Sequence, residues 1–120
     1  MPEKRIAGTC YLKVDGDQLE LAGSINVSIQ KTEKEGLSGL SGVPGYKETA
    51  RVPFIEIEAF VPKGFPRKKL EGMEDATVTA ELANGETAVL SGAWLAGTAD
   101  VNGAEGSTNL KFEGVDGKWI

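Results

Sequence analysis

Apolar and polar residues alternate along most of this chain, which is the pattern of half-buried β-strands. Residues 24–30 place Ile25, Val27 and Ile29 on one face and polar side chains on the other. Residues 54–61 repeat the pattern with isoleucines on one face and carboxylates on the other. Two such runs predict strands of an antiparallel sheet with one buried and one hydrated face.

Further runs of the same kind occupy residues 7–14, 18–21, 76–83, 86–91, 94–99 and 107–113. Turn dipeptides separate them at Asp15-Gly16, Asn84-Gly85 and Asn102-Gly103. A proline near the start and a glycine just past the end predict a short helix within residues 65–72. The chain is therefore expected to be a single domain, residues 1–120. Its expected fold class is mainly β, an antiparallel β-sandwich or partly closed β-barrel with one short α-helix.

A long connection of residues 31–51 separates the two clearest strands. Its centre is rich in glycine and carries an apolar residue at every third position: Leu37, Leu40 and Val43. Small domains rarely contain so long a loop without regular structure unless the loop has a function or is disordered. We predict a structureless loop that becomes ordered by something outside its own domain.

Composition excludes several classes of chemistry. The 120 residues contain no histidine and one cysteine, so Ser-His and Cys-His nucleophiles and Cys/His zinc sites are ruled out. No phosphate-binding glycine motif precedes a helix. We expect no enzyme activity, no cofactor and no metal. The net charge of -5 argues against tight binding to nucleic-acid phosphates, and no apolar run is long enough to span a membrane.

Carboxylates gather on the predicted outward positions of the strands. Glu56 and Glu58 share one strand face, and Glu20, Glu81 and Glu113 occupy outward positions elsewhere. The simplest interpretation is a solvated polar face. A second is a pair of catalytic carboxylates for glycoside hydrolysis, which requires a cleft. A third is a surface lining a passage that repels phosphates.

Aromatic residues leave a different class of function open. Trp94 and Tyr46 can serve as stacking platforms in a monomeric β-sandwich module that binds a ligand such as a carbohydrate. A tryptophan within a strand is more often part of the core. A binding module would remain monomeric, whereas an assembly subunit would form large particles.

Three blocks of sequence resemble the tail tube proteins of Mu-like contractile-tailed bacteriophages and prophages. The blocks are residues 7–16 (AGTCYLKVDG), residues 43–55 (VPGYKETARVPFI), and residues 79–85 with 90–93 (TAELANG and LSGA). Together they span nearly the whole chain in a consistent order.

The resemblance implies a structural virion protein. Subunits of this family form rings, expected to be hexameric, that stack into the inner tube of a contractile tail. It also implies partners: further copies of the chain, a sheath protein, a tape-measure protein and baseplate or initiator proteins. Phage DNA would pass through the lumen without specific binding. The implied location is the virion tail, and the bacterial host cytoplasm during assembly, without membrane insertion.

Two sets of residues acquire roles from this resemblance. The ring-stacking set is expected to contact the neighbouring ring and consists of Gly36, Leu37, Leu40, Val43, Gly45 and Tyr46. The lumen set is expected to face the passage and consists of Glu56 and Glu58 with some of Glu20, Glu81 and Glu113.

Overall fold

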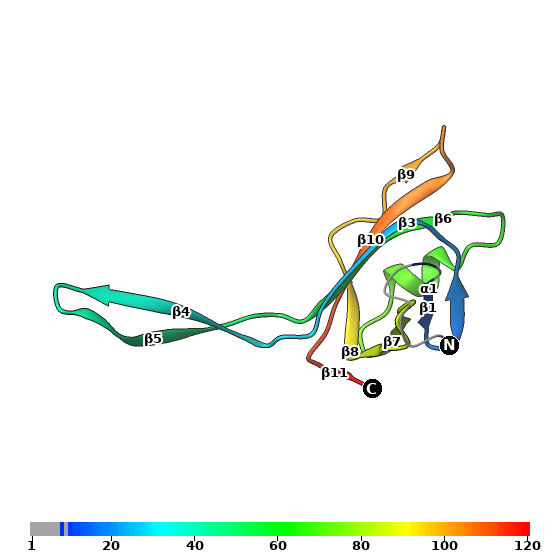
Figure 1. The fold of residues 1–120 in the computed structure, drawn as a ribbon. Coiled ribbons are helices and arrows are strands. Elements are labelled where there is room, and N and C mark those ends of the chain that lie inside the picture. The colour runs from blue at the N-terminus through cyan, green and yellow to red at the C-terminus, as the bar shows by residue number, and fades with distance from the viewer. Residues whose placement is uncertain (1–7, 9) are drawn as a thin grey trace.

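Eleven strands and one short helix make up the described part of the chain (Figure 1). The structure is a computed structural model that describes Gly8 and residues 10–120. The elements in chain order are β1 (Tyr11–Val14), β2 (Asp17–Leu19), β3 (Leu21–Ser28), β4 (Thr32–Gly39), β5 (Gly42–Ala50), β6 (Phe54–Phe60), α1 (Arg67–Glu71), β7 (Ala76–Glu81), β8 (Thr87–Ala96), β9 (Val101–Asn102), β10 (Ser107–Glu113) and β11 (Asp116–Trp119). Every strand pair among them is antiparallel.

Strand β8 belongs to two layers of the fold. Its first part pairs with β7 and β11, whereas its last residues, Trp94 to Ala96, pair with β10. The change of partner follows Gly92, whose φ of +60° lies in the left-handed region that favours glycine. The register against β7 also shifts there by one residue, as in a β-bulge, which bends a strand. The bend folds one sheet into two layers.

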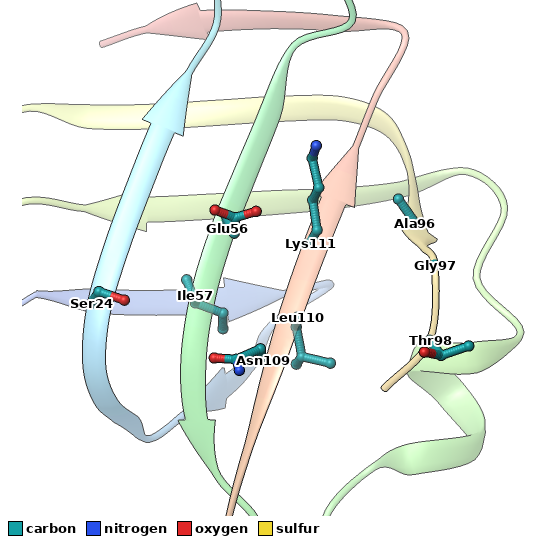
Figure 2. Close-up of a pocket in the computed structure, with 9 residues that line it drawn as sticks. All are labelled: Ser24, Glu56, Ile57, Ala96, Gly97, Thr98, Asn109, Leu110 and Lys111. Atoms are coloured by element: carbon teal, nitrogen blue, oxygen red, sulfur yellow. The ribbon is translucent and has the colours of Figure 1, made fainter. Parts of the chain in front are cut away.

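We name the layers by their strand order. Sheet A runs β2-β1-β7-β8-β11, and sheet B runs β8-β10-β6-β3 with β9 beside β10. Figure 2 shows the strands of sheet B crossing at a steep angle over those of sheet A behind them. This is the orthogonal form of sheet packing, in which one strand passes from one layer to the other at a corner.

The hydrophobic core lies between the two layers. Alternate residues of the longer strands of both layers point inward, and the largest fully buried side chains are Phe112, Leu12, Ile55, Ile57, Leu70, Leu90, Leu110, Val14 and Val78. Leu70 comes from α1, and Phe65 and Met73 pack partly buried beside it. The helix is too short to be stable alone, so these apolar contacts hold it against the sheets.

These observations confirm the predicted fold class. The chain is mainly β, with antiparallel pairing and one short helix, and the two layers form a sandwich that is not closed into a barrel. The Asp15-Gly16 and Asn84-Gly85 turns connect the predicted neighbours. The predicted strand 7–14 begins outside the described residues, because positions 7 and 9 are not described.

The structure of segment 31–51 differs from the prediction made for it. It is a two-stranded β-hairpin, β4 and β5, and the prediction of a loop without regular structure is wrong. Glycine content hid the strands, and the threefold spacing of the apolar residues does not match the twofold period of a strand. The hairpin stretches the molecule to 62 Å, with a radius of gyration of 17.1 Å. A compact chain of this length would have a radius near 14 Å.

Three further strand assignments differ from the sequence prediction. The runs 86–91 and 94–99 belong in large part to the single bent strand β8. Strand β9 pairs with the start of β10, and β11 pairs with β8 near the end of the chain. Both new strands are short, and neither has the alternating pattern that identifies a half-buried strand.

Truncation of a core side chain should lower the free energy of unfolding far more than truncation of a side chain at the end of the hairpin. Phe112→Ala removes a side chain with no exposed surface and should lower the free energy of unfolding by about 3–5 kcal/mol. Leu40→Ala, at the tip of the hairpin, should change it by less than about 0.5 kcal/mol. Urea denaturation of the unassembled protein measures both values, and equal losses would contradict the assigned core.

Candidate assembly surfaces

The hairpin β4–β5 projects from the body with both of its faces exposed (Figure 1). Its register pairs Thr32 with Ala50 and continues to Leu37 opposite Gly45, then slips by one residue before the turn. A two-stranded hairpin that packs against nothing is marginally stable in water. This element therefore lacks the burial that stabilises core strands such as β6, β7 and β10.

The end of the hairpin is apolar and uncharged. We call residues 36–46 the tip; they contain no charged side chain. Leu40 is fully exposed and Val43 is 74% exposed, while Leu37 and Tyr46 are also exposed. Clustered exposed apolar side chains mark interaction surfaces in soluble proteins. The sequence-derived ring-stacking residues thus lie together, at the part of the molecule farthest from the core.

Charged pairs hold the shaft of the hairpin, residues 32–35 and 47–51. Lys47 lies 3.3 Å from Glu35 on one face, and the ammonium of Lys34 lies 5.0 Å from the centre of the Tyr46 ring on the other. Exposed pairs of this kind contribute about 0–1 kcal/mol each. They fit the register of the shaft but supply little of the stability that a buried face would give.

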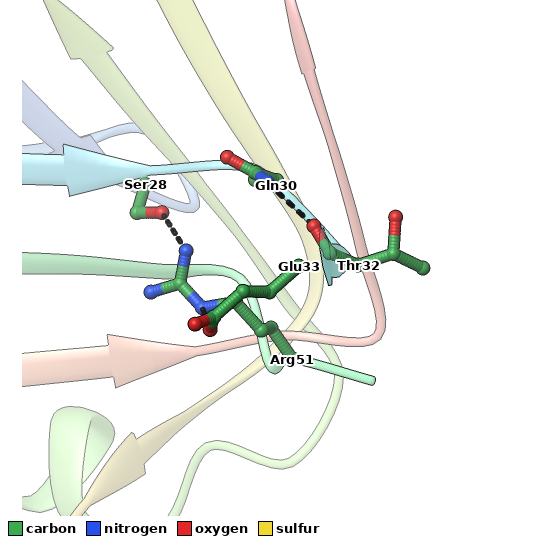
Figure 3. Close-up of polar contacts among 5 residues, drawn as sticks. All are labelled: Ser28, Gln30, Thr32, Glu33 and Arg51. Atoms are coloured by element: carbon green, nitrogen blue, oxygen red, sulfur yellow. Dashed lines mark hydrogen bonds and ion pairs between the residues drawn. The ribbon is translucent and has the colours of Figure 1, made fainter. Parts of the chain in front are cut away.

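The base of the hairpin is tied to both layers. Figure 3 shows the guanidinium of Arg51 donating to Ser28 Oγ at 3.3 Å and pairing with Glu33 at 3.6 Å. The backbone N–H of Arg51 donates to the carbonyl of Lys31 at 2.7 Å, which continues the β3–β6 ladder toward the hairpin. Gln30 Nε2 donates to the carbonyl of Thr32. These contacts hold the direction of the hairpin relative to sheet B.

A further ion pair links the base to sheet A. Lys31 lies 3.2 Å from Asp116 on β11. The hydrogen bond from Lys31 holds the pKa of Asp116 below its ordinary value of 3.8, and the Gly117 N–H adds to the effect. Gly117 lies so close to Ile29 that a β-carbon there would collide with the Ile29 side chain. Strand β11 therefore packs directly over the end of β3.

The outer face of sheet B carries three of the five predicted lumen residues. We call this surface the acidic face: Glu56 and Glu58 on β6, and Glu113 on β10. The cross-strand partner of Glu56 is Lys111 (Figure 2), and that of Glu58 is Asn109. Lys111 turns its ammonium over the Phe54 ring, 4.7 Å from its centre. The face thus holds three carboxylates and one ammonium, and at its margin the guanidinium of Arg51 is paired with Glu33.

The other two predicted residues lie elsewhere. Glu81 is on the outer face of sheet A, opposite Tyr11 and Thr87, on the other side of the core from the acidic face. Glu20 lies between β2 and β3, at the edge of the body. The sequence could not separate these positions because alternation shows which residues point outward but not which layer carries them.

Three features of these surfaces were missed or misassigned. Trp94 was expected in the core, but it is only partly buried and pairs with Glu113 on the outer side of sheet B. Lys111 escaped notice because a single lysine in a strand carries no signal of its cross-strand partner. Strand β11 was not predicted either, because its Gly-Lys-Trp sequence has no hydrophobic alternation.

A shallow depression of about 450 Å³ lies on the acidic face (Figure 2). Its lining includes Glu56, Lys111, Asn109, Ser24 and Thr98. Glu58 does not line it; its carboxylate faces Ser107 Oγ at 3.4 Å and lies over Gly23. The two carboxylates of the glycosidase interpretation therefore do not converge on one cleft. No helix of the described residues has the length and apolar character to cross a membrane.

An exposed apolar hairpin, open sheet edges and a polar sheet face are the features of a subunit built for assembly. The chain belongs to the phage tail tube protein family, whose model matches residues 3–119. The resemblance inferred from the sequence is thereby confirmed. Members of this family are structural components of the tail, so the chain is a structural protein and not an enzyme.

Solved structures of contractile injection systems have the same fold. The sheath/tube terminator of an extracellular contractile injection system, PVC, is 12% identical with a TM-score of 0.62, covering 100% of this chain and 96% of that one. The tube-terminating cap of the anti-feeding prophage is 11% identical with a TM-score of 0.63, covering 100% and 94%. A PVC sheath-tube complex is 11% identical with a TM-score of 0.60, covering 99% and 91%. No curated protein matches the chain in sequence.

The ion pair at the base of the hairpin gives a prediction about pH. A carboxyl whose pKa is lowered by folding contributes stability above its unfolded pKa and loses it as pH falls through the folded value. In wild-type protein, Asp116 should therefore titrate below 3.8, and Lys31→Gln should raise its pKa. Carbon-detected NMR titration of the carboxyl measures both. Lys118→Gln is the matched control and should have a smaller effect, because Lys118 acts only through its charge.

Proposed function

We propose that this protein is the subunit of a phage tail tube, stacking as rings of six copies to form the inner tube of a contractile tail. The observation that carries the proposal is the hairpin β4–β5, whose every residue is exposed in the single chain. Family membership supports the tube, and the exposed tip supports contacts between rings. In this proposal the ring-stacking residues are Gly36, Leu37, Leu40, Val43, Gly45 and Tyr46.

Sheet B is the surface best suited to line the lumen. Its acidic face carries Glu56, Glu58 and Glu113 against one lysine, whereas the outer face of sheet A balances Glu81 and Asp116 with Lys13 and Lys118. A lining with excess negative charge repels phosphates and lets DNA pass without adhering. We therefore keep these three carboxylates in the lumen set and leave out Glu20 and Glu81.

Open edges support closure into a ring. Strand β3 pairs only with β6 among the described strands, so its eight residues leave an unpaired row of backbone groups at the margin of sheet B. Such edges recruit strands from other chains. A neighbouring copy that pairs along this edge would continue the sheet, and a repeated heterologous contact of this kind closes into a ring.

The remaining partners follow from the tube role. The similar solved structures include a complex of sheath and tube, and we propose that a sheath protein surrounds this tube as well. A tape-measure protein would occupy the lumen during assembly, and baseplate or initiator proteins would start the stack. Assembly would take place in the host cytoplasm, before DNA is ejected through the finished tail.

Shortening the hairpin tests the proposal. Replacing residues 36–46 by Asn-Gly keeps the Glu35–Lys47 pair beside a two-residue turn, so the body should fold with an unchanged melting temperature. Wild-type protein at high concentration should form rings and tubes in negative-stain electron microscopy, while this variant should form rings that do not stack. Leu37→Ser/Leu40→Ser/Val43→Ser, which keeps the length of the hairpin, should fail in the same way.

Two outcomes would count against the tube role. Normal tubes from both variants would remove the hairpin from the stacking contact. A wild-type protein that stays monomeric and binds a carbohydrate saturably would favour the alternative of a β-sandwich binding module.

Charge reversal tests the assignment of the lumen. Tubes carrying Glu56→Lys/Glu58→Lys should retain short double-stranded DNA, and retention should fall roughly tenfold between 50 and 200 mM salt. The matched control is Glu81→Lys/Glu86→Lys on sheet A and its β7–β8 turn, which adds the same charge outside the proposed lumen. Filter-binding measurements on purified tubes compare the two; equal retention would refute the acidic face as the lining.

A further inference from the structure

Exposed apolar side chains concentrate at two places in the described chain. Of eleven large hydrophobic residues that are exposed, four belong to the tip and three lie on or beside β11: Val115, Trp119 and Ile120. The other four are scattered over separate segments: Tyr11, Val52, Phe60 and Val101. Single exposed apolar residues are ordinary, whereas groups of them mark contact surfaces. We call the second group the β11 edge.

The β11 edge also has unpaired backbone groups. Among the described strands, β11 pairs with β8 alone and is the last strand of sheet A. Trp119 remains 46% exposed and Ile120 72% exposed, although the backbone of Ile120 exchanges two hydrogen bonds with Thr87. The edge is therefore fixed in position by pairing and by the Lys31–Asp116 contact, while its apolar side chains remain uncovered.

The tip has matching chemistry. It is apolar, it carries no charge that would have to be desolvated, and both outer edges of its two strands are unpaired among the described strands. Burying an exposed leucine or valine against Trp119 removes apolar surface from water on both sides of the contact. Each chain carries one tip and one β11 edge, so in an assembly of identical copies every tip can bind one β11 edge.

The positions of the tip and the β11 edge bear on the kind of assembly that contacts between them would form. The β11 edge lies at the base of the hairpin, where Lys31 meets Asp116, and the tip lies at its far end. An eight-residue strand spans about 26 Å, so the end of the tip lies roughly that distance beyond the base of the hairpin. A contact between different surfaces is heterologous, and where the rotation between successive copies does not close a ring it repeats as open growth along one direction.

We propose that the tip of one copy docks on the β11 edge of a copy in the next ring, with Leu40 and Val43 covering Trp119. This inference rests on the proposed tube function and names the surface that receives the hairpin. The β11 edge then has two contacts: its own hairpin's base through Lys31, and the tip of another copy through Trp119.

Disulfide trapping between copies tests the contact. In a Cys10→Ser background, the pair Leu40→Cys/Trp119→Cys should give a ladder of covalent multimers when tubes are mildly oxidised and run on a non-reducing gel. The matched control is Leu40→Cys/Val101→Cys, which places the second thiol on exposed β9. The first pair should give roughly tenfold more multimers, because a disulfide requires β-carbons within about 4.5 Å.

A substitution provides a second measurement. Trp119→Asp should raise the protein concentration needed for tube growth roughly tenfold, because it puts a charge where apolar surface is buried. Val101→Asp should leave that concentration unchanged. Thermal melting of the unassembled variants checks that both fold.

The outcomes separate the two proposals. Tubes that form normally but give a ladder only from the control pair, or from neither pair, overturn the β11 edge as the receiving surface and leave the tube function standing. A wild-type protein that forms no rings or tubes overturns the tube function itself. A ladder from the Leu40/Trp119 pair, together with the loss of growth in Trp119→Asp, supports both.

Discussion

The body and the projecting hairpin both depend on the backbone pairing between β3 and β6. Within the body, this pairing sets Ile25 opposite Ile57 and Val27 opposite Ile55, so that one face of sheet B closes the core. Beyond the body, β3 leads into β4 and β5 leads into β6, with only three residues at each junction. The hairpin therefore continues the β3–β6 strand pair, and we call the whole extended pair the ribbon. The buried residues of β3 and β6 fix the register at the base of the hairpin.

The two halves of this ribbon are stabilised in different ways. The body half buries alternate side chains between two layers, which supplies the main favourable term in folding. The hairpin half buries none, and its exposed ion pairs contribute about 0–1 kcal/mol each. A strand pair of this length without a buried face is only marginally stable in water on its own. In the proposed tube, contacts with other copies would give the hairpin the burial that the core gives the body.

The sequence predicted the body well because its strands have one buried face. Alternation identified the ribbon strands around Ile25 and Ile57, and turn dipeptides located two of the hairpins. Alternation does not identify strands that lack a face buried by the chain's own core. The β4–β5 strands have no buried face within the chain, so their residues lack the period on which the prediction depends. The carboxylates were recognised as outward-facing, but their division between two layers depends on the bend at Gly92, which no local pattern reveals.

The continuity of the ribbon also connects the tip with the acidic face. Glu56 and Glu58 lie on β6, directly after the strand that returns from the tip, and Arg51 at the junction bonds to Ser28 on the neighbouring strand. A contact that holds the tip therefore restrains the direction of β3 and β6, and with it the orientation of the acidic face. If the tip engages the next ring, the same interaction that joins two rings also aligns their carboxylates along the passage. Stacking and lining are then two consequences of one extended strand pair rather than separate devices.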